Sequence, residues 1–297
     1  MENLKGVGVA LVTPFLQNGE IDYSAFEKLV NHNINNGVDF IVVQGTTGES
    51  ATLSIENKQK LLSRAVEIAD HRVPVVYGHG GNNTQQLIDS YKTLDLTGVT
   101  AILSVSPYYN KPSQEGVVAH FEALHEAFDL PIILYNVPGR TGSNMSATTI
   151  LKLAKLKGII GVKEASGDLG QMNQVIKNRP DGFMVWSGDD DLILQQMAMG
   201  ADGVISVIGN ALPAEFTDLV HSAAKGDFTT SRQRHFQLND IIPLLFEEGN
   251  PGGIKAVLKM IGIGEEHMLL PLVPISDDLR DRLKSELEKA GILNESK

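Results

Sequence analysis

Eight short apolar runs rich in Val and Ile alternate along the chain with stretches that have the hydrophobic period of an amphipathic helix. This alternation constrains the fold more than any other feature, because strands that alternate with helices pair in parallel through crossover connections. Eight such units are typical of a closed parallel barrel, so the sequence predicts an α/β protein with a (β/α)8 TIM barrel. The predicted strands are residues 7–12, 40–43, 73–77, 101–105, 132–135, 159–162, 183–186 and 203–207.

The last part of the chain has helical signals and no strand signal. We expect a C-terminal helical domain at 226–297, after a catalytic barrel at 1–225. Its predicted helices are 231–246, 253–261 and 276–290, separated by prolines, which interrupt helices. Within the barrel, residues that favour helix starts are Asp22, Ser54, Thr84, Ser113 and Ser146.

The main alternative architecture is a doubly wound open sheet. Its dinucleotide-binding form requires Gly-x-Gly-x-x-Gly directly after the first strand. Residues 13–15 read Thr-Pro-Phe instead. We therefore favour the barrel.

Composition limits the functional class. The 297 residues include 25 basic and 36 acidic side chains and carry a net charge of −11, which disfavours nucleic acid or an anionic membrane as a general partner. Cysteine is absent, which excludes disulfides and thiolate metal ligands. No run approaches the roughly 18 apolar residues of a membrane span, and residues 1–5 lack the apolar core of a signal peptide. We expect a cytoplasmic protein.

Lys163 closes the sixth apolar run. Apolar surroundings favour the neutral amine of a lysine, which is a nucleophile for carbonyl carbon. A structural lysine that reaches water or an acid is the competing interpretation. Side chains alternate along a strand, so Ile159, Gly161 and Lys163 should point one way and Ile160 and Val162 the other. If Ile160 and Val162 face the outer helices, Lys163 points into the barrel with Gly161 beneath it.

Polar segments follow several other strands. They should converge on one face with Lys163, because catalytic groups of such barrels come from the carboxyl ends of the strands. Each segment alone reads as an ordinary turn, a packing aromatic or a surface charge. We favour the functional interpretation because all of these segments are predicted to lie at the same end of the barrel. The segments are 45–49, 106–110, 135–140 and 187–190.

Four segments, 45–50, 107–112, 135–142 and 161–165, carry motifs in an order and spacing that resemble the dihydrodipicolinate synthase family, the 4-hydroxy-tetrahydrodipicolinate synthases. The resemblance implies a cofactor-free condensation of pyruvate with L-aspartate 4-semialdehyde through a lysine Schiff base, in diaminopimelate and lysine biosynthesis. It also implies a homotetramer built from two tight dimers.

The resemblance assigns roles to individual residues. Lys163 matches the Schiff-base lysine and Tyr135 the proton donor and acceptor. Thr46 and Tyr109 match a proton relay, with the equivalent of Tyr109 reaching in from the neighbouring subunit. The expected substrate contacts are Thr47 and the Ile205 backbone for the pyruvate carboxylate, Gly188 in the same pocket, and Arg140 for the carboxylate of the aldehyde.

Two alternatives stay open, one within the same superfamily and one that is not an enzyme. Sialic acid lyases and keto-sugar acid aldolases of the same superfamily also use a lysine on the sixth strand, although Arg140 favours a small anionic aldehyde. A non-catalytic ligand-binding or assembly barrel is possible because fold does not prove activity. We expect no metal site, since the spacing of the histidines that we considered does not suggest a ligand set. Those histidines are His32, His71, His79, His120 and His125.

Feedback inhibition by lysine is expected to be weak or lost. Family members that are inhibited hold lysine at the tight dimer interface, where an acid meets its amines. Asn82 and Tyr108 match that site here, but Gln86, Lys58 and Ile55 occupy its other positions. A neutral amide and an added positive charge are poor partners for ammonium groups.

Overall fold

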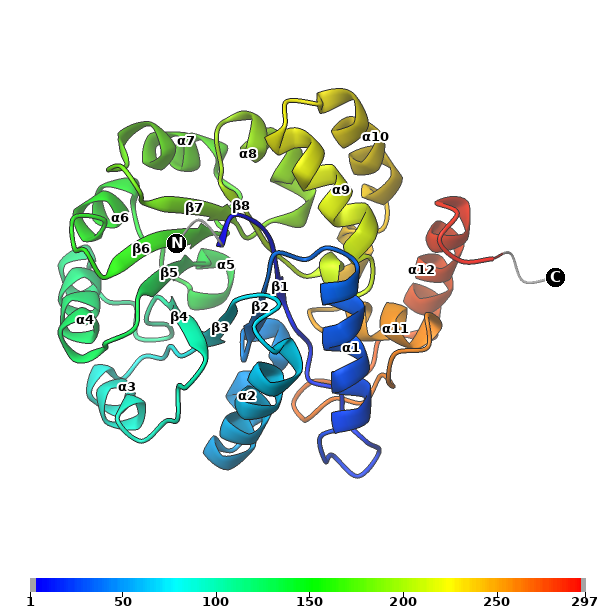
Figure 1. The fold of residues 1–297 in the computed structure, drawn as a ribbon, viewed down its shortest axis with the longest axis horizontal. Coiled ribbons are helices and arrows are strands. Elements are labelled where there is room, and N and C mark those ends of the chain that lie inside the picture. The colour runs from blue at the N-terminus through cyan, green and yellow to red at the C-terminus, as the bar shows by residue number, and fades with distance from the viewer. Residues whose placement is uncertain (1–3, 295–297) are drawn as a thin grey trace.

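Eight parallel strands close into a barrel in chain order, with β8 hydrogen-bonded back to β1, in a computed structural model that describes residues 4–294 (Figure 1). This confirms the predicted (β/α)8 barrel. Residues 1–3 and 295–297 lie outside the described residues. The expectation that residues 1–5 are not a signal peptide therefore concerns residues that are only partly described. The strands are β1 (Gly6–Ala10), β2 (Phe40–Val43), β3 (Val75–Gly78), β4 (Val99–Val105), β5 (Ile132–Asn136), β6 (Ile159–Glu164), β7 (Met184–Ser187) and β8 (Gly203–Ser206).

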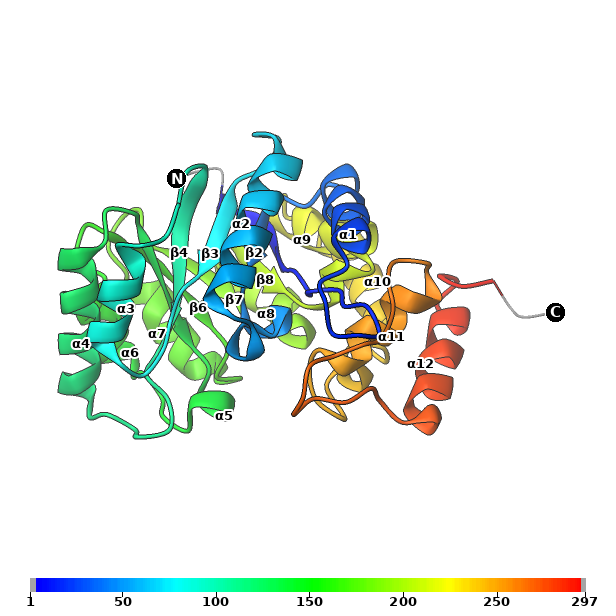
Figure 2. The ribbon, with the colours of Figure 1, turned by 90° about the horizontal axis from the view of Figure 1, so that it is seen from below.

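The helices surround the strands and continue into a group at the C-terminal end, where α11 lies between the barrel and α12 (Figure 2). No helix of residues 4–294 is long and apolar enough to span a membrane. The α-helices are α1 (Tyr23–Asn35), α2 (Ile55–Ala69), α3 (Thr84–Tyr91), α4 (Gln114–Ala127), α5 (Pro138–Thr141), α6 (Ala147–Leu153), α7 (Leu169–Asn178), α8 (Ile193–Ala198), α9 (Pro213–Ala224), α10 (Phe228–Leu238), α11 (Gly252–Met260) and α12 (Asp277–Lys289).

Four of the five predicted helix starts are caps in the structure. Their side chains accept a backbone N–H of the first turn, which satisfies a donor that has no partner within the helix. Thr84 is the exception: Asn83 caps α3 by accepting the N–H of Gln86, whereas the Thr84 hydroxyl bonds to Nδ1 of His120. The four confirmed caps are Asp22, Ser54, Ser113 and Ser146.

Two apolar clusters form the core. The larger lies between the barrel wall and the surrounding helices, and the smaller fills the barrel interior. In the interior, Phe40 and Trp186 meet edge to face with ring centroids 6.3 Å apart, and the Trp186 indole N–H donates to the carbonyl of Leu4 at 2.7 Å. These side chains are part of the packing that fills the barrel interior.

The predicted side-chain alternation of the sixth strand is partly wrong. Ile132 pairs with Ile159 but Ile133 pairs with Gly161, so Ile160 is an extra residue in β6. Ile160 therefore belongs to the interior cluster and Ile159 to the outer one, the reverse of the expectation. From Gly161 onward the predicted alternation is correct. A Cβ at Gly161 would point into the interior, where it would lie 2.5 Å from the ring of Trp186.

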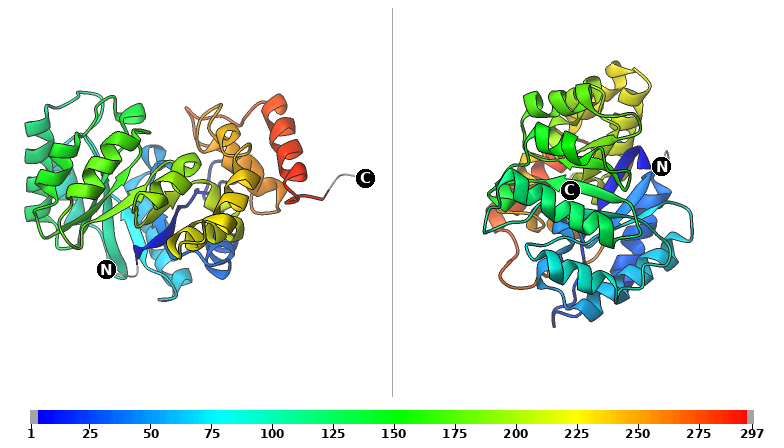
Figure 3. Two further views of the ribbon diagram at one scale, coloured as in Figure 1. Left: turned by 90° about the horizontal axis from the view of Figure 1, so that it is seen from above. Right: turned by 90° about the vertical axis from the view of Figure 1, so that its left-hand side faces the viewer.

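The C-terminal segment is helical as expected, but one predicted helix was wrong. The range 231–246 is divided: α10 begins after Asp227, which accepts the N–H groups of Thr229 and Thr230, and it ends at Leu238. A separate 3-10 turn, η6 (Pro243–Leu245), begins at a proline that has no N–H to donate. Both α11 and α12 lie within one residue of their predicted bounds. Figure 3 shows α12 at the end of the molecule farthest from the barrel.

Candidate active site

A cavity of about 400 Å³ opens at the carboxyl ends of the strands. The segments after β2, β5, β6 and β7 contribute to its lining, as expected for a barrel of this kind. The C-terminal segment also contributes, through Phe246, Gly249 and Asn250. Predicted site residues that line the cavity are Thr46, Thr47, Tyr135, Arg140, Lys163 and Gly188.

Lys163 and Tyr135 lie side by side in this cavity. They are register partners on β6 and β5, and the Lys163 Nζ atom is 4.5 Å from the centroid of the Tyr135 ring. Only 5% of Lys163 and 7% of Tyr135 is exposed. A buried primary amine beside a phenol can add to a ketone and exchange protons with the adduct.

Gly188 lies against the Lys163 side chain. A Cβ at position 188 would be 3.0 Å from the Cε of Lys163 and 2.5 Å from the Cβ of Ala165. The Gly188 N–H donates to the carbonyl of Glu164 at 2.7 Å, which fixes the backbone in this place. Only a residue without a side chain fits here.

Thr46 and Thr47 form a 3-10 turn, η2 (Thr46–Gly48), directly after β2. The Thr47 side chain is buried, and its Oγ1 accepts a hydrogen bond of 2.9 Å from Nδ2 of Asn250. Thr46 also lines a smaller chamber of about 100 Å³ that Tyr135 shares. Sequence reasoning missed Asn250, since nothing in its neighbourhood signals a contact 203 residues away.

Three predicted residues lie at the rim or away from the cavity. Arg140 is exposed on α5 at the cavity edge. The side chain of Ile205 is fully buried in the barrel interior, and Val207, two residues further along the chain, lines the cavity. Tyr109 is 87% exposed and does not line the cavity of this single chain.

Two adjacent carboxyl groups set the charge near Lys163. Burial raises the pKa of Asp189, a lining residue, to about 6, while the N–H of Gly167 donates to it at 3.1 Å. Asp190 is fully buried and accepts the N–H groups of Val207 and Ile208, each at 2.9 Å. Burial raises the pKa of Asp190, and the two N–H donors, with a smaller effect from the charge of Lys163, oppose that shift.

The residues matched to the lysine site also meet. A pocket of about 210 Å³ is lined by polar and apolar side chains and by no carboxylate of the described residues. Burial lowers the pKa of its one lysine, Lys58. The predicted residues in this pocket, which we call the regulatory pocket, are Ile55, Lys58, Asn82, Gln86 and Tyr108.

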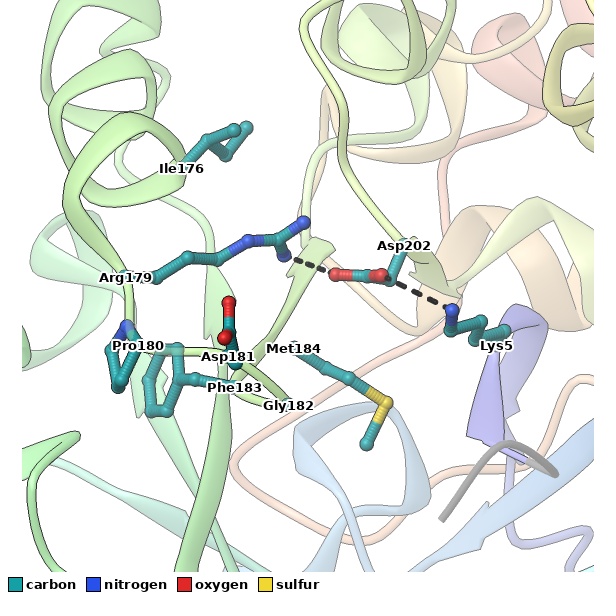
Figure 4. Close-up of a pocket in the computed structure, with 9 residues that line it drawn as sticks. All are labelled: Lys5, Ile176, Arg179, Pro180, Asp181, Gly182, Phe183, Met184 and Asp202. Carbon is teal, nitrogen blue, oxygen red and sulfur yellow. Dashed lines mark hydrogen bonds and ion pairs between the residues drawn. The ribbon is translucent and has the colours of Figure 1, made fainter.

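A larger cavity of about 480 Å³ lies at the opposite, amino-terminal end of the strands (Figure 4). Three of its charged groups are engaged with one another: Arg179 pairs with Asp202, and Lys5 approaches Asp202 at 4.0 Å. Residues at this end of a barrel serve stability rather than chemistry. In residues 4–294, no group of three or more His, Cys, Asp or Glu side chains is arranged to hold a metal ion.

A profile of the Dihydrodipicolinate synthetase family matches residues 3–290. The chain belongs to that family. A relative from Parabacteroides distasonis, named 4-hydroxy-tetrahydrodipicolinate synthase, is 47% identical over 291 residues, which cover 98% of each chain. The fold and its motifs are thus those of the Dihydrodipicolinate synthetase family.

Solved structures agree. The crystal structure of a dihydrodipicolinate synthase from Thermotoga maritima matches with a TM-score of 0.94 at 41% identity, over 97% of this chain and 99% of that one. A dihydrodipicolinate synthase from Cyanidioschyzon merolae, crystallised with lysine bound, matches with a TM-score of 0.93 at 37% identity, over 98% and 99% of the two chains. Members of this family therefore share the whole architecture with the chain.

Proposed function

We propose that this protein is a 4-hydroxy-tetrahydrodipicolinate synthase, which condenses pyruvate with L-aspartate 4-semialdehyde in diaminopimelate and lysine biosynthesis. The observation that carries the proposal is the buried amine of Lys163, 4.5 Å from the ring of Tyr135 at the carboxyl end of the barrel. Family membership supports the same reaction. The chemistry uses only side chains and substrates and requires no cofactor.

Lys163 attacks the ketone carbon of pyruvate, and loss of water gives a protonated Schiff base. The positive nitrogen accepts electrons when a methyl proton leaves, and an enamine results. The enamine carbon then attacks the aldehyde, forming the new carbon–carbon bond. Finally, the amino group of the second substrate attacks the Schiff-base carbon, the ring closes, and Lys163 leaves as the free amine.

Tyr135 carries protons in this cycle. A phenol has a reference pKa near 10, so it needs a chain of hydroxyls to exchange protons near neutral pH. Thr46, which lines the same cavity, provides the next hydroxyl. Tyr109 of a second copy completes the relay, a role consistent with its 87% exposure on a single chain.

The remaining predicted residues bind substrate. Thr47 and the backbone at Ile205 contact the pyruvate carboxylate, and the backbone of Gly188 faces the same pocket. Arg140 binds the carboxylate of aspartate semialdehyde, for which the planar guanidinium offers paired donors. Its exposed position on α5 at the rim suits a second substrate that enters after pyruvate.

The assembly that we propose is a homotetramer of two tight dimers in the cytoplasm. Ile55, Tyr108 and Tyr109 are exposed apolar or aromatic side chains, the type that subunit contacts bury. Within each subunit we divide the chain into a catalytic barrel, 1–225, and a C-terminal helical domain, 226–297.

A coupled assay tests the function. Purified protein is given pyruvate with aspartate semialdehyde and, in parallel, sialic acid or keto-sugar acids in the cleavage direction. We expect turnover with the first pair only. Turnover of a sugar acid alone would assign the chain to a lyase branch of the superfamily, and no turnover with any substrate would favour a binding or assembly protein.

A further inference from the structure

A buried ion pair joins the C-terminal segment to the loop that carries Thr46 and Thr47. The Nζ atom of Lys255, on α11, lies 2.5 Å from Oε1 of Glu49, directly after η2. The side chain of Lys255 is 1% exposed and that of Glu49 is 0% exposed. These residues are 206 positions apart, so the contact depends on the folded chain.

Both charged groups are held by further contacts. The Lys255 ammonium also donates to the carbonyl of His267 at 2.8 Å and lies 4.4 Å from the centre of the Phe15 ring. The second oxygen of Glu49 accepts the N–H of Leu269 at 3.0 Å. The pair therefore connects α11 and the 267–269 segment to the barrel through hydrogen bonds.

The same loop connects to the active-site cavity. Glu49 ends η2 with a left-handed backbone (φ 55°), and its N–H donates to the carbonyl of Thr46 at 3.1 Å. Asn250, just before α11, donates to the Thr47 hydroxyl. The C-terminal segment thus contacts the middle residue of the short turn and the residue that ends it.

A contribution to stability alone does not explain why this ion pair is buried. Removing two charges from water is costly, and replacing a buried ion pair with well-packed neutral side chains is often neutral or stabilising. Burial lowers the pKa of Lys255 to about 8 even with the carboxylate of Glu49 beside it, so desolvation is the larger effect. What a buried pair provides and an apolar contact lacks is a fixed geometry.

We propose that Lys255 and Glu49 are positioning residues that hold the Thr46–Thr47 turn in its reactive geometry, so that the C-terminal segment completes the active site. The inference rests on the roles proposed above for Thr46 and Thr47. Neither charged group touches substrate. They act through the turn, whose misplacement weakens pyruvate binding at Thr47 and proton transfer at Thr46.

The test is the double variant Glu49→Gln with Lys255→Met. Gln keeps an acceptor for the Leu269 N–H, and Met keeps the length of the lysine stem, so no unpaired charge stays buried. The matched control removes an exposed pair of the same segment through Glu247→Gln with Arg282→Met. For each protein we would measure the melting temperature, kcat, and the KM of each substrate.

We expect the double variant to fold, with a roughly 10-fold or greater rise in the KM of pyruvate and a comparable fall in kcat. The KM of aspartate semialdehyde should change little, because Arg140 lies on a different element, α5. A role in stability alone would instead lower the active fraction and leave both KM values unchanged. The control pair should leave all three kinetic parameters at wild-type values.

Glu49→Gln alone keeps nearly all packing and decides the matter if the double variant does not fold. It leaves the Lys255 amine without a carboxylate, so it is assayed above pH 8, where burial favours the neutral amine and the carbonyl of His267 still accepts its hydrogen bond. It should show the same split between the two KM values at smaller amplitude. A folded double or single variant with wild-type kcat and pyruvate KM would overturn the inference while wild-type condensation activity upholds the proposed function. Wild-type protein that traps no pyruvate and forms no product would overturn the proposed function itself.

Discussion

Gly188 and Lys163 are packed so closely that a Cβ on the glycine would stand 3.0 Å from Cε of the lysine. The same Cβ would be 2.5 Å from the Cβ of Ala165, an atom that cannot move without its backbone. The close contact limits the positions available to the Lys163 side chain. The contact explains why position 188 is a glycine, which turn geometry alone does not explain.

Gly188→Ala should therefore displace Lys163 or the end of β6. We expect kcat to fall by about 10-fold or more, because small misplacements of a reacting group are costly, and the rate of Schiff-base formation to fall with it. Gly81→Ala is the matched control, since its added Cβ would meet only Leu87 at an ordinary 3.5 Å. Equal rates for the two variants would contradict the steric argument.

Lys163 itself should be the residue that bonds to pyruvate. Borohydride reduction in the presence of pyruvate should leave one covalent adduct, which peptide mass spectrometry would place on Lys163. Lys163→Ala should lose the adduct and nearly all turnover. Trapping on Lys255, the other well-buried lysine described above, would overturn the assignment.

Substitutions in the proton relay and substitutions at the carboxylate contact of the second substrate should have different kinetic effects. Tyr135→Phe and Thr46→Val each remove a hydroxyl of the relay and should lower kcat by about 10² or more, the usual scale of acid–base catalysis. Arg140→Ala should mainly raise the KM of aspartate semialdehyde and leave pyruvate trapping intact. Steady-state kinetics beside borohydride trapping distinguishes the two effects, and an unchanged aldehyde KM in Arg140→Ala would remove the best support for this substrate.

Local sequence patterns predicted the parts of this structure that depend on local chemistry. Strand and helix periods identified the barrel, and side chains that accept an N–H identified four helix caps. The error at the sixth strand came from a contact that no short window contains. The extra residue at Ile160 depends on how β5 pairs with β6.

In the active site, too, residues with a local sequence signal were predicted and residues defined by long-range contacts were missed. Lys163 and Tyr135 could be placed because each ends a recognisable strand, and parallel strands bring their carboxyl ends together. Asn250 and Lys255 were missed, because their partners Thr47 and Glu49 lie about two hundred residues away. A lysine inside the apolar run 252–258 was the one sequence signal available for Lys255.

His120 should make the fold sensitive to acid. It is buried on α4, where Thr84 bonds to its Nδ1 at 2.8 Å, and burial lowers its pKa to about 4 from an ordinary 6.5. Between these values the unfolded chain binds a proton that the folded chain does not. The stability contributed by the neutral ring is therefore complete above pH 6.5 and is lost as the pH falls toward 4.

His120→Gln cannot titrate and should reduce the loss of unfolding free energy between pH 7.5 and 4.5 by on the order of 2 to 3 kcal/mol. Urea unfolding followed by the fluorescence of Trp186, the single tryptophan, measures this difference. The exposed His71 serves as a control through His71→Asn. Identical pH dependence in His120→Gln and wild type would show that His120 is not the acid-sensitive group.

Lysine should inhibit this enzyme weakly or not at all. The regulatory pocket would have to accept two ammonium groups, yet no carboxylate of the described residues lines it. Gln86 offers a neutral amide, and Lys58 adds positive charge within the Debye length of roughly 8 Å at physiological salt. Loss of one charge-assisted hydrogen bond costs about 1.5 to 3 kcal/mol, or roughly 10- to 150-fold in affinity.

A lysine titration at subsaturating pyruvate tests this expectation, and half-inhibition below about 1 mM, a binding free energy near −4 kcal/mol, would contradict it. Gln86→Glu should strengthen inhibition, because it places a carboxylate in the pocket where an ammonium group can meet it. Gln85→Glu adds the same charge on the same helix outside the pocket lining and should change nothing. Equal effects of the two variants would mean that charge near α3, rather than a partner inside the regulatory pocket, governs the response.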